Sequence, residues 1–555
     1  MLKHDVLVIG AGLAGMRAAL EAHDRGCDVA IVSKLHPMRS HSGAAQGGIN
    51  AAIGKNDSWQ KHFRDTVVAG DWLCDQDAVE VLCREAPNAI RELEKFGVLF
   101  SRDGRGDIAQ RPFGGQGVAR TCFAADKTGH EMLNALYGEV QRRGITVYEE
   151  WFVTALAGNG ACTGAVAWEI ASGEIQAISA KAVVLATGGL GRLYGRTTNA
   201  LCCTGDGMAL ALRAGALLKD IEFIQFHPTT LAGNNILISE AARGEGGVLL
   251  NRLGERFMKK YAREAELAPR DVVARSIQRE IDAGNGFPGG YVQLDLRGLG
   301  KEKISERLPQ VREICMHFAG IDPAEEPIPV QPAQHYAMGG IAVDLDGASS
   351  VSGLFAAGEC ACSGVHGANR VGGNSLLETI VFGKRVGRAA ARYAARASVD
   401  VSEAERALER EKRRLSEIFS RRGRSHYVLK RRMQEIMDRF VGIFRNARGM
   451  REASDKLAAL RKAIGRVGVV DKEKEFNTDL LALLELDFSL EVAMAVVASA
   501  LARKESRGAH YRTDYPKPSR EWLRHTLAGV RGGEIVLDYE PVRMIRLKVK
   551  GWKYT

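Results

Sequence analysis

Three short apolar runs lie far apart in the chain, and each is followed by glycine. They cover residues 6–9, 182–186 and 354–357. Runs that are apolar at every position are typical of strands buried on both faces of a parallel sheet. The pattern therefore predicts one α/β domain assembled from two separated stretches, residues 1–221 and 340–400.

The remaining segments carry different patterns. Residues 222–339 lie between the two stretches and predict an inserted α+β domain. Residues 401–515 are strongly charged, with apolar positions at helical spacing, which predicts a helical domain. Residues 516–555 contain short alternating runs and predict a small strand-containing tail. The predicted fold class is therefore α/β: a Rossmann-like domain with an inserted domain, followed by the helical domain and the tail.

No segment predicts a membrane span. The most apolar late stretch, residues 480–502, is interrupted by Glu485, Asp487 and Glu491. Charges are costly at the centre of a bilayer, so a buried helix pair is expected there. The N-terminal residues enter a strand at once and leave no room for a signal or transit peptide. We therefore expect a protein kept in the cytoplasm of a prokaryote.

Composition limits the class of protein. A chain of 555 residues is longer than a single core usually allows, so two or more domains are expected. A hydrophobic fraction of 45% and a charged fraction of 26% are ordinary for a soluble globular protein. The ten cysteines are scattered without a CxxC pair, which disfavours an iron–sulfur cluster or structural zinc and predicts buried free thiols. No metal site is predicted, so electrons that leave this chain must find metal elsewhere.

The net charge of +10 leaves two interpretations open. A positive field can steer a small dianionic substrate or attract an acidic partner, and it can also favour the binding of nucleic acid. No recognition motif with interleaved aromatic residues is present, so nucleic-acid binding is not expected. The most basic segment, residues 411–433, has apolar residues among its charges and predicts a solvated helical face, with partner docking as the alternative.

A glycine-rich turn follows the first predicted strand. Gly10 permits a tight turn, Gly12 lets the backbone approach a pyrophosphate, and Gly15 lets helix and strand pack closely. The following helix offers free N–H groups and a positive dipole end to phosphates. In this strand–turn–helix context the motif predicts a dinucleotide site. Its residues are Gly10, Ala11, Gly12, Leu13, Ala14 and Gly15.

The end of the second predicted strand departs from the usual dinucleotide pattern. An acidic residue normally stands there and holds a ribose hydroxyl, but this chain has Ser33 and Lys34. The serine hydroxyl can still bond a ribose, although the departure disfavours NAD. Asp206 offers a carboxylate elsewhere, either to a ribose or ribityl hydroxyl or as the N-cap of a helix.

Five basic side chains between residues 225 and 375 indicate an anion site. They lie beside glycine, proline or other small residues, as is typical of loops that bring side chains close to a ligand. Arginine offers a planar pair of donors that matches a carboxylate, and histidine offers one directed donor. A substrate with a carboxylate at each end needs donors at both ends. The residues are His227, Arg243, Arg270, His335 and Arg370.

Nine motifs follow one another along nearly the whole chain. They are RSHSGAAQGGINAAIG from Arg39, QRPFGG from Gln110, ATGGLGRLYGRTTNA from Ala186, QFHPT from Gln225, SEAARGEGG from Ser239, APRDVVARSI from Ala268, QHYAMGG from Gln334, GECACSGVHGANRVGGNSLLE from Gly358 and ESRGAHYRTDYP from Glu505. In this order they resemble the flavoprotein subunits of the succinate dehydrogenase and fumarate reductase family. Only the tail beyond about residue 525 looks unfamiliar.

The resemblance implies an FAD-binding domain with a capping domain inserted into it, and the interconversion of succinate and fumarate. It also implies that FAD is bonded covalently to His41, whose imidazole raises the potential of the flavin ring. Gln46 stands where some fumarate-directed members carry Glu, which favours succinate oxidation weakly. The further cofactor contacts that the resemblance implies are Ser40, Ser42, Ala45, Gln46, Gly47, Gly48, Glu359, Ser375 and Leu376.

Substrate and proton roles follow from the same resemblance. The positions that match carboxylate ligands are His227, Ser239, His335 and Arg370. Ser239 replaces a more usual threonine and keeps its hydroxyl. Phe113 matches an aromatic residue packed against the substrate, with a core phenylalanine as the alternative. Arg270 matches the residue that handles the proton, and Glu240 and Arg243 match its relay towards solvent, or form a structural salt bridge.

The resemblance also implies partners: an iron–sulfur subunit and, through it, a membrane anchor and quinone, with the chain peripheral on the cytoplasmic face of the inner membrane. Three alternatives stay open. They are an L-aspartate oxidase, whose family lacks a histidine at the position of His41, a thiol-linked fumarate reductase subunit, and a subunit with a vestigial flavin site. The direction of reaction, the final electron acceptor, the anchor type, the oligomeric state and the role of the tail are not settled by the sequence.

Overall fold

The computed structural model describes residues 2–398, 401–423 and 425–548. Its largest sheet has the order β6-β2-β1-β9-β8-β7, with β16 paired to β9. The strands are β1 (Leu2–Ile9), β2 (Val29–Ser33), β6 (Thr146–Glu149), β7 (Trp151–Gly158), β8 (Cys162–Glu169), β9 (Ile175–Leu185) and β16 (Leu354–Ala356). The three apolar runs thus meet, because β1 and β16 both pair with β9 in parallel. The expected Rossmann-like sheet built from separated stretches is confirmed.

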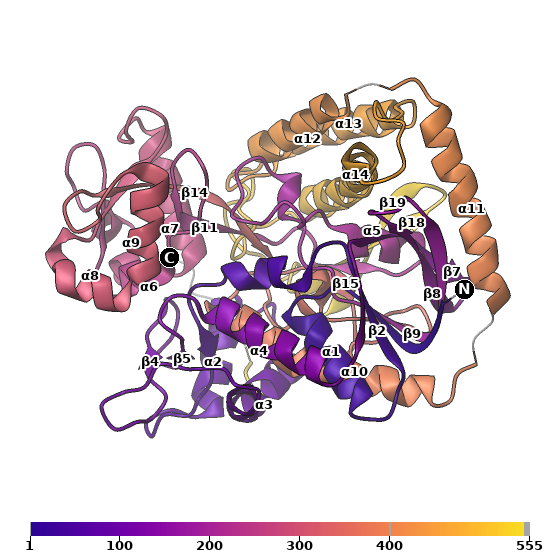
Figure 1. Cartoon of the computed structure of the whole chain (residues 1–555). Helices are drawn as coiled ribbons and strands as arrows, with labels where there is room; N and C mark the ends of the chain where they lie inside the picture. The colour runs from indigo at the N-terminus through magenta and orange to yellow at the C-terminus, as the bar shows by residue number, and fades with distance from the viewer. Residues whose placement is uncertain (1, 399–400, 424, 549–555) are drawn as a thin grey trace.

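Helices α1 and α10 lie together beside this sheet (Figure 1). Their close approach depends on Gly383 and Gly387, one turn apart on α10. A Cβ at these positions would lie 2.8 Å from the Ala14 oxygen and 2.2 Å from the Ala18 oxygen of α1. The neighbouring elements are α1 (Leu13–His23), α2 (Trp59–Ala69), α3 (Gln76–Lys95), α4 (Thr128–Arg142) and α10 (Asn374–Ala394), with a small sheet of β3 (Ile49–Asn50), β4 (Gln110–Arg111) and β5 (Thr121–Cys122).

A separate lobe projects to the left in Figure 1 and is called the cap lobe below. Its sheet has the order β11-β14-β13-β12 and packs its own apolar core, which includes Leu249, Leu294 and Val330. Its elements are β11 (Ile224–Leu231), α6 (Glu240–Gly244), β12 (Val248–Leu250), α7 (Arg270–Asp282), β13 (Val292–Asp295), α8 (Lys301–Arg307), α9 (Pro309–Ala319) and β14 (Ile328–Ala337). The predicted boundaries at residues 222 and 339 stay predictions.

The C-terminal helices lie away from the cap lobe, at the top and right of Figure 1. They are α11 (Val401–Ser420), α12 (Tyr427–Phe440), α13 (Ala447–Ile464) and α14 (Thr478–Ala502), and α14 packs on α5 (Asp206–Arg213). The expected helix pair at residues 480–502 is wrong, since α14 is one continuous helix. Two of its charges are tolerated because Arg213 bonds Asp487 and Glu491 at 2.8 Å each. No helix within the described residues is long and apolar enough to cross a membrane.

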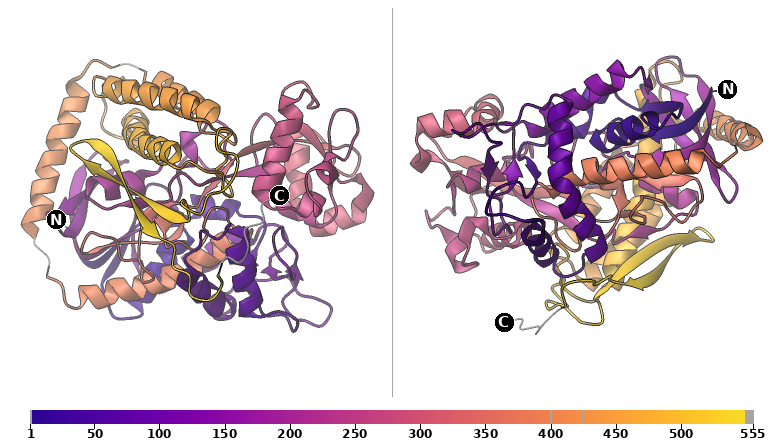
Figure 2. Two further views of the ribbon diagram at one scale, coloured as in Figure 1. Left: turned by 180° about the vertical axis from the view of Figure 1, so that it is seen from behind. Right: turned by 90° about the horizontal axis from the view of Figure 1, so that it is seen from below.

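The predicted strand-containing tail is a hairpin, drawn in yellow in Figure 2. Strands β18 (Arg524–Arg531) and β19 (Glu534–Pro541) extend a second mixed sheet in the order β17-β15-β10-β18-β19. The other members are β10 (Leu218–Lys219), β15 (Gly340–Ala342) and β17 (Ala361–Cys362). All ten cysteines are free thiols, and eight of them are buried, as expected.

A buried ion network joins this hairpin to the rest of the molecule. His525 contacts Asp220 at 2.6 Å and Asp75 at 3.1 Å. The ammonium of Lys219 bonds Asp75 at 2.7 Å and Glu540 at 3.0 Å. Burial disfavours a charged imidazole, but the two aspartates raise the pKa of His525 to about 9. The hairpin is therefore held by a cationic histidine between two carboxylates.

We expect this network to make stability depend on pH. The folded pKa of His525 lies above the ordinary value of 6.5, so its stabilisation is complete below pH 6.5 and is lost as pH rises through about 9. Each pKa unit corresponds to about 1.4 kcal/mol, which gives about 3 kcal/mol in total. Thermal unfolding of the parent and His525→Gln proteins at pH 6 and pH 9.5 measures how much His525 contributes to the free energy of unfolding. The difference in free energy of unfolding between parent and variant should be smaller at pH 9.5 than at pH 6. An equal difference at the two pH values would contradict a cationic His525 in this network.

Candidate active site

One cavity connects the glycine turn after β1 with the inner side of the cap lobe. Its walls contain every residue that the sequence assigned to cofactor or substrate except Gly15, and two of the three catalytic candidates, Arg270 and Glu240. Gly15 and Arg243 lie outside these walls. Gly15 instead sets the packing of α1, because a Cβ there would lie 1.9 Å from the Gly10 oxygen. The structure therefore brings the predicted residues into one continuous site.

The glycine turn leaves room for a ligand beside the N-terminus of α1. Gly12 holds the N-cap position of α1 and offers no side chain to it. A Cβ on Gly12 would lie 3.1 Å from the Ser40 hydroxyl and 3.3 Å from the Ser42 hydroxyl. Any side chain at this position would therefore press against the two serines. The backbone of the turn, the helix dipole and these serines suit the pyrophosphate of a dinucleotide.

His41 begins a short 3-10 helix, His41–Ala44, whose preceding Ser40 caps it by accepting from the Ser42 N–H. Donors face both nitrogens of the His41 ring. The Ala200 N–H donates to Nδ1 at 3.3 Å, and the Asn199 amide nitrogen lies 3.2 Å from Nε2. Burial and the nearby charge of Arg192 lower the pKa of His41 to about 4, so the ring is neutral.

The side chains at the end of β2 bond within the protein. Lys34 contacts Asp206 at 2.5 Å and Glu485 at 2.8 Å, while the Ser33 hydroxyl donates to the Leu35 oxygen at 2.6 Å. Burial opposes the charge of Lys34, but Asp206 and Glu485 raise its pKa well above the usual range. The N-cap alternative for Asp206 is wrong, because Gly205 caps α5 with φ of 80° and Asp206 is its first helical residue. The ribose contact of Ser33, the ribose or ribityl contact of Asp206 and the cofactor contact of Lys34 stay predictions.

Arg270, Glu240 and Arg243 form a buried chain of alternating charge. The Arg270 Nε donates to Glu240 Oε2 at 2.6 Å, and an Arg243 nitrogen lies 3.8 Å from Glu240 Oε1. Helix α7 begins at Arg270 and α6 begins at Glu240, so two helix starts bring them together. Burial works against ionisation of Glu240, but the two arginines lower its pKa. Glu240 is thus an anion bonded on both sides by cations.

Two histidines and a second arginine complete the polar end of the cavity. The rings of His227 and His335 lie 5.0 Å apart, and burial lowers the pKa of both well below the ordinary value. The Arg370 guanidinium bonds the Ser375 hydroxyl at 2.9 Å and lies 4.1 Å above the ring of Tyr336. Both histidines were predicted to lie on loops, but His227 lies on β11 and His335 on β14. Two paired strands of the cap-lobe sheet, rather than loops, therefore fix both rings.

Several buried polar atoms in this region have no partner among the described residues. They include His227 Nε2, Arg370 Nε and Gln46 Oε1. A buried donor left unpaired is costly, so such atoms are expected where a polar ligand binds. The Ser239 hydroxyl, also buried, caps α6 through the Ala241 N–H at 3.2 Å. Phe113 closes the site from another side, since a Cβ on Gly47 would lie 2.7 Å from its ring.

Gln225 is a site residue that was not predicted from the sequence. It is fully buried, and its Oε1 accepts from Arg270 at 3.2 Å and from Arg370 at 3.1 Å. Its Nε2 donates to the Asn369 side chain at 2.8 Å and to the Arg370 oxygen at 2.9 Å. One amide therefore bridges two guanidinium groups that would otherwise repel each other. Its place in the QFHPT motif, two residues before His227, was the available signal.

The residues of the cavity fit a flavin dinucleotide. A glycine turn and helix start suit the phosphates, and α10 begins at Asn374 and places Ser375 and Leu376 in the cavity wall. Glu359 faces the cavity close to Gly189, and burial raises its pKa to about 7. A carboxyl group of this kind can bond hydroxyls of a ribityl or ribose chain. The same cavity is also lined by His41, Gln46 and Gly47.

Comparisons with known proteins agree with this geometry. Residues 5–376 match a family described as FAD binding domain, and residues 430–554 match one described as Fumarate reductase flavoprotein C-term. The chain is 45% identical to the succinate dehydrogenase flavoprotein subunit of Rickettsia bellii, covering 98% of this chain and 96% of the relative. It is 46% identical to the fumarate reductase flavoprotein subunit of Mycobacterium tuberculosis, covering 98% of each.

Solved structures of fumarate reductase and Sdh1 chains are similar to this chain over nearly its whole length. A chain of an E. coli quinol fumarate reductase superposes with a TM-score of 0.96 at 40% identity, covering 99% of both chains. A chain of Mycobacterium smegmatis Sdh1 solved with UQ1 superposes with a TM-score of 0.87 at 38% identity, covering 98% of this chain and 95% of that chain.

Proposed function

Because the chain belongs to the family of succinate dehydrogenase and fumarate reductase flavoprotein subunits, we propose that it interconverts succinate and fumarate as the FAD-carrying subunit of such an enzyme. The observation that carries the proposal is the cavity that joins a dinucleotide cradle to a buried cluster of two histidines and two arginines. A four-carbon dianion needs hydrogen-bond donors at both ends, and two arginines and two neutral histidines are such donors.

The chain's own residues divide into binding and proton-handling groups. His227, Ser239, His335 and Arg370 hold the two carboxylates, and Phe113 packs against the carbon chain and excludes water. Bound FAD supplies the acceptor or donor of the hydride. Arg270 exchanges a proton with a central carbon of the substrate. An arginine keeps its proton in water, so it needs a partner that replaces or removes that proton. Glu240, bonded to Arg270 at 2.6 Å, is that partner, and Arg243 continues the chain.

We further propose that His41 carries the flavin through a covalent bond at Nε2. A neutral imidazole keeps a proton on one ring nitrogen and can accept only at the other. Because the Ala200 N–H donates to Nδ1, the ring nitrogen left to carry a substituent is Nε2. Attachment at Nε2 would break the Nε2–H bond and one C–H bond of the flavin methyl group, release both hydrogens as protons and leave two electrons on the flavin ring. Nδ1 would then remain free to accept from the Ala200 N–H. The low pKa of His41, about 4, keeps the remaining nitrogen neutral.

The proposed partners are an iron–sulfur protein and, through it, a membrane anchor and quinone. Relatives are named as flavoprotein subunits, and solved relatives include a quinol-fumarate reductase with menaquinol. On this proposal the chain is peripheral, on the cytoplasmic face of the membrane. Copurification of an iron–sulfur protein with the chain from its natural host tests the assignment.

The proposed substrate is tested by offering the flavin-loaded chain succinate and L-aspartate in parallel without oxygen. Succinate should bleach the oxidised flavin spectrum, and malonate should block this by occupying the carboxylate ligands. Reduction by L-aspartate but not by succinate would contradict the proposal and would favour the oxidase alternative.

Gln225→Leu should weaken the site while preserving its shape. The substitution removes the acceptor shared by Arg270 and Arg370 and leaves both guanidinium groups short of a partner. We expect turnover to fall about 100-fold and the dissociation constant for malonate to rise about 10-fold, in line with a displacement of reacting groups by about 1 Å. Steady-state kinetics and a spectral titration with malonate measure the two effects. Unchanged values for both would show that the bridge is dispensable.

A further inference from the structure

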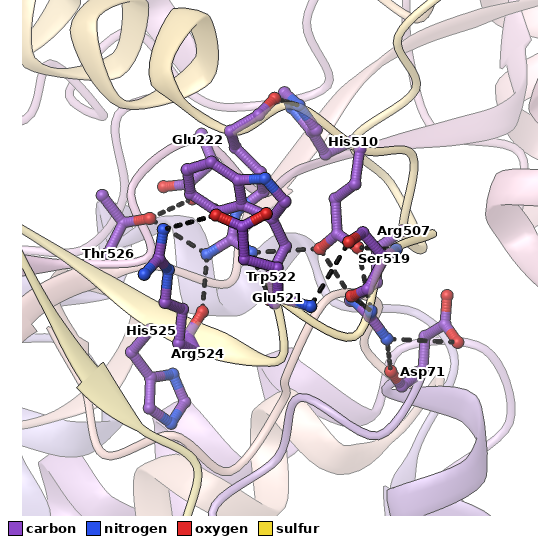
Figure 3. A network of polar contacts seen from close by, with 12 residues as sticks. Asp71, Glu222, Arg507, His510, Ser519, Glu521, Trp522, Arg524, His525 and Thr526 are labelled. Carbon is purple, nitrogen blue, oxygen red and sulfur yellow. Dashed lines mark hydrogen bonds and ion pairs between the residues drawn. The ribbon is translucent and has the colours of Figure 1, made fainter. Parts of the chain in front are cut away.

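The motif ESRGAHYRTDYP has no role in the site described so far. It covers residues 505–516, called the strap below, which follow α14. A buried network holds the start of the strap (Figure 3). Glu505 accepts from Arg503 at 3.1 Å and from Arg507 at 2.8 Å, and Arg507 in turn donates to the Asp71 oxygen at 2.8 Å. The side chains of Arg503, Glu505 and Arg507 are fully buried. The first part of the strap is therefore held by Arg503, which precedes it in the chain, and by Asp71, which follows α2.

The second part of the strap is anchored to the end of α14. Arg512 donates to the oxygens of Ala500 and Leu501 at 3.1 Å each and to that of Arg503 at 3.0 Å. These carbonyls lack partners within the helix, so Arg512 serves as a C-terminal cap. The same guanidinium bonds Asp514 at 2.8 Å.

Between these anchors the strap contacts the loop that carries Arg370. The Ala509 N–H donates to the Ala368 oxygen at 2.9 Å, two residues before Arg370. Gly508 adopts a left-handed φ of +49°, and a Cβ there would lie 2.5 Å from the Ala368 oxygen. The Gly508 N–H also donates to the Asp71 carboxylate at 3.0 Å. A glycine is therefore required at the point where strap and loop meet.

The opposite side of the strap contacts α7, the cap-lobe helix that begins at Arg270. Arg275 donates to the Gly508 oxygen at 2.8 Å and is held in place by Asp271 at 2.7 Å. The guanidinium groups of Arg275 and Arg279, one turn apart, lie 5.3 and 5.8 Å from the ring centre of Tyr511. A cation above an aromatic face is attracted to it. The strap thus holds one face of α7.

We infer that the strap fixes the spacing between Arg270 and Arg370, and that Arg275 is the positioning residue through which it does so. Arg270 begins α7 of the cap lobe, whereas Arg370 lies in the loop between β17 and α10. Gly508 contacts both sides, through its own oxygen to Arg275 and through its neighbour Ala509 to Ala368. The inference rests on the proposed function, since the spacing of the two arginines matters only if Arg270 transfers a proton to a substrate that Arg370 binds.

Loss of the Arg275 contact should affect turnover more than binding. A displacement of about 1 Å at a reacting group can cost about 100-fold in rate. We expect Arg275→Ala to lower kcat by at least about 10-fold, while the malonate dissociation constant changes by less than about 3-fold, because His227, His335 and Arg370 are held from elsewhere. Arg275→Lys keeps one donor but cannot bond Gly508 and Asp271 as a planar fork, so it should restore kcat in part.

The experiment compares these variants with Arg297→Ala in the flavin-loaded chain. Arg297 is an exposed cap-lobe arginine that pairs with Asp295 at 2.8 Å, so its loss removes an ion pair without touching the strap. Hydrogen exchange of residues 270–276 should accelerate in Arg275→Ala and stay unchanged in Arg297→Ala. This readout does not depend on turnover.

Parent-like kcat and parent-like exchange in Arg275→Ala would overturn the inference, as would an equal loss of kcat in Arg297→Ala. If Arg275→Ala does not fold, Arg275→Lys decides: kcat and exchange equal to those of the parent would overturn the inference. A parent protein that does not turn over succinate or fumarate would instead contradict the proposed function. In that case slower exchange of α7 in the parent than in Arg275→Ala would still support the contact.

Discussion

Arg270→Lys should bind a dicarboxylate yet lose nearly all turnover. Lysine keeps the positive charge, but it lacks the planar group that bonds Glu240 and Gln225 at 2.6 and 3.2 Å. General acid–base catalysis contributes about 10²- to 10⁴-fold, and we expect a loss of this size in kcat in both directions of the reaction. The dissociation constant for malonate should change by less than about 10-fold, because the histidines and Arg370 remain.

Stopped-flow reduction of the flavin by succinate, together with a malonate titration, separates the two effects. The rate of reduction should fall while malonate still perturbs the flavin spectrum. Near-normal reduction in Arg270→Lys would refute the proton role of Arg270 and would leave Glu240 and Arg243 as a structural ion chain.

His41→Ala should retain FAD in the cradle but release it on denaturation. The glycine turn, the start of α1 and the residues around Glu359 do not depend on the imidazole. Without the electron-withdrawing imidazole substituent the flavin potential falls, so succinate oxidation should drop at least about 10-fold. Fumarate reduction driven by a strong artificial reductant should be affected much less, because the dicarboxylate ligands remain.

His130→Ala is a matched control for this variant, since His130 is exposed on α4 and lies outside the cavity. Flavin should stay with the protein after acid precipitation in the parent and in the control, and should appear in the supernatant only for His41→Ala. Retention of flavin by precipitated His41→Ala would place the bond on another residue.

Local patterns predicted much of this molecule. Apolar runs followed by glycine identified three strands of the main sheet, since strands buried on both faces need apolar residues at every position. The glycine turn after β1 could be interpreted because its strand and helix are adjacent in sequence. The family motifs predicted the cavity residues, but those positions came from resemblance and not from spacing.

What the sequence could not give depends on contacts between distant residues. The ion pair between Lys34 and Glu485 could not be predicted, because the two residues lie about 450 positions apart in the sequence. Residues 480–502 were expected to form a buried helix pair and not one helix, and nothing local indicates that Arg213 neutralises Asp487 and Glu491. Gln225 was missed because a neutral amide on a buried strand carries no chemical signal until two arginines are seen to share its oxygen.

The most direct test of the central claim is an anaerobic titration of the purified flavin-loaded chain with succinate, followed by denaturation and proteolysis. Succinate should bleach the flavin, and the flavin should then be found on the peptide that contains His41. A flavin that stays oxidised under excess succinate, or that is released free on denaturation, would contradict a site in which a tethered flavin faces Arg270 across a dicarboxylate.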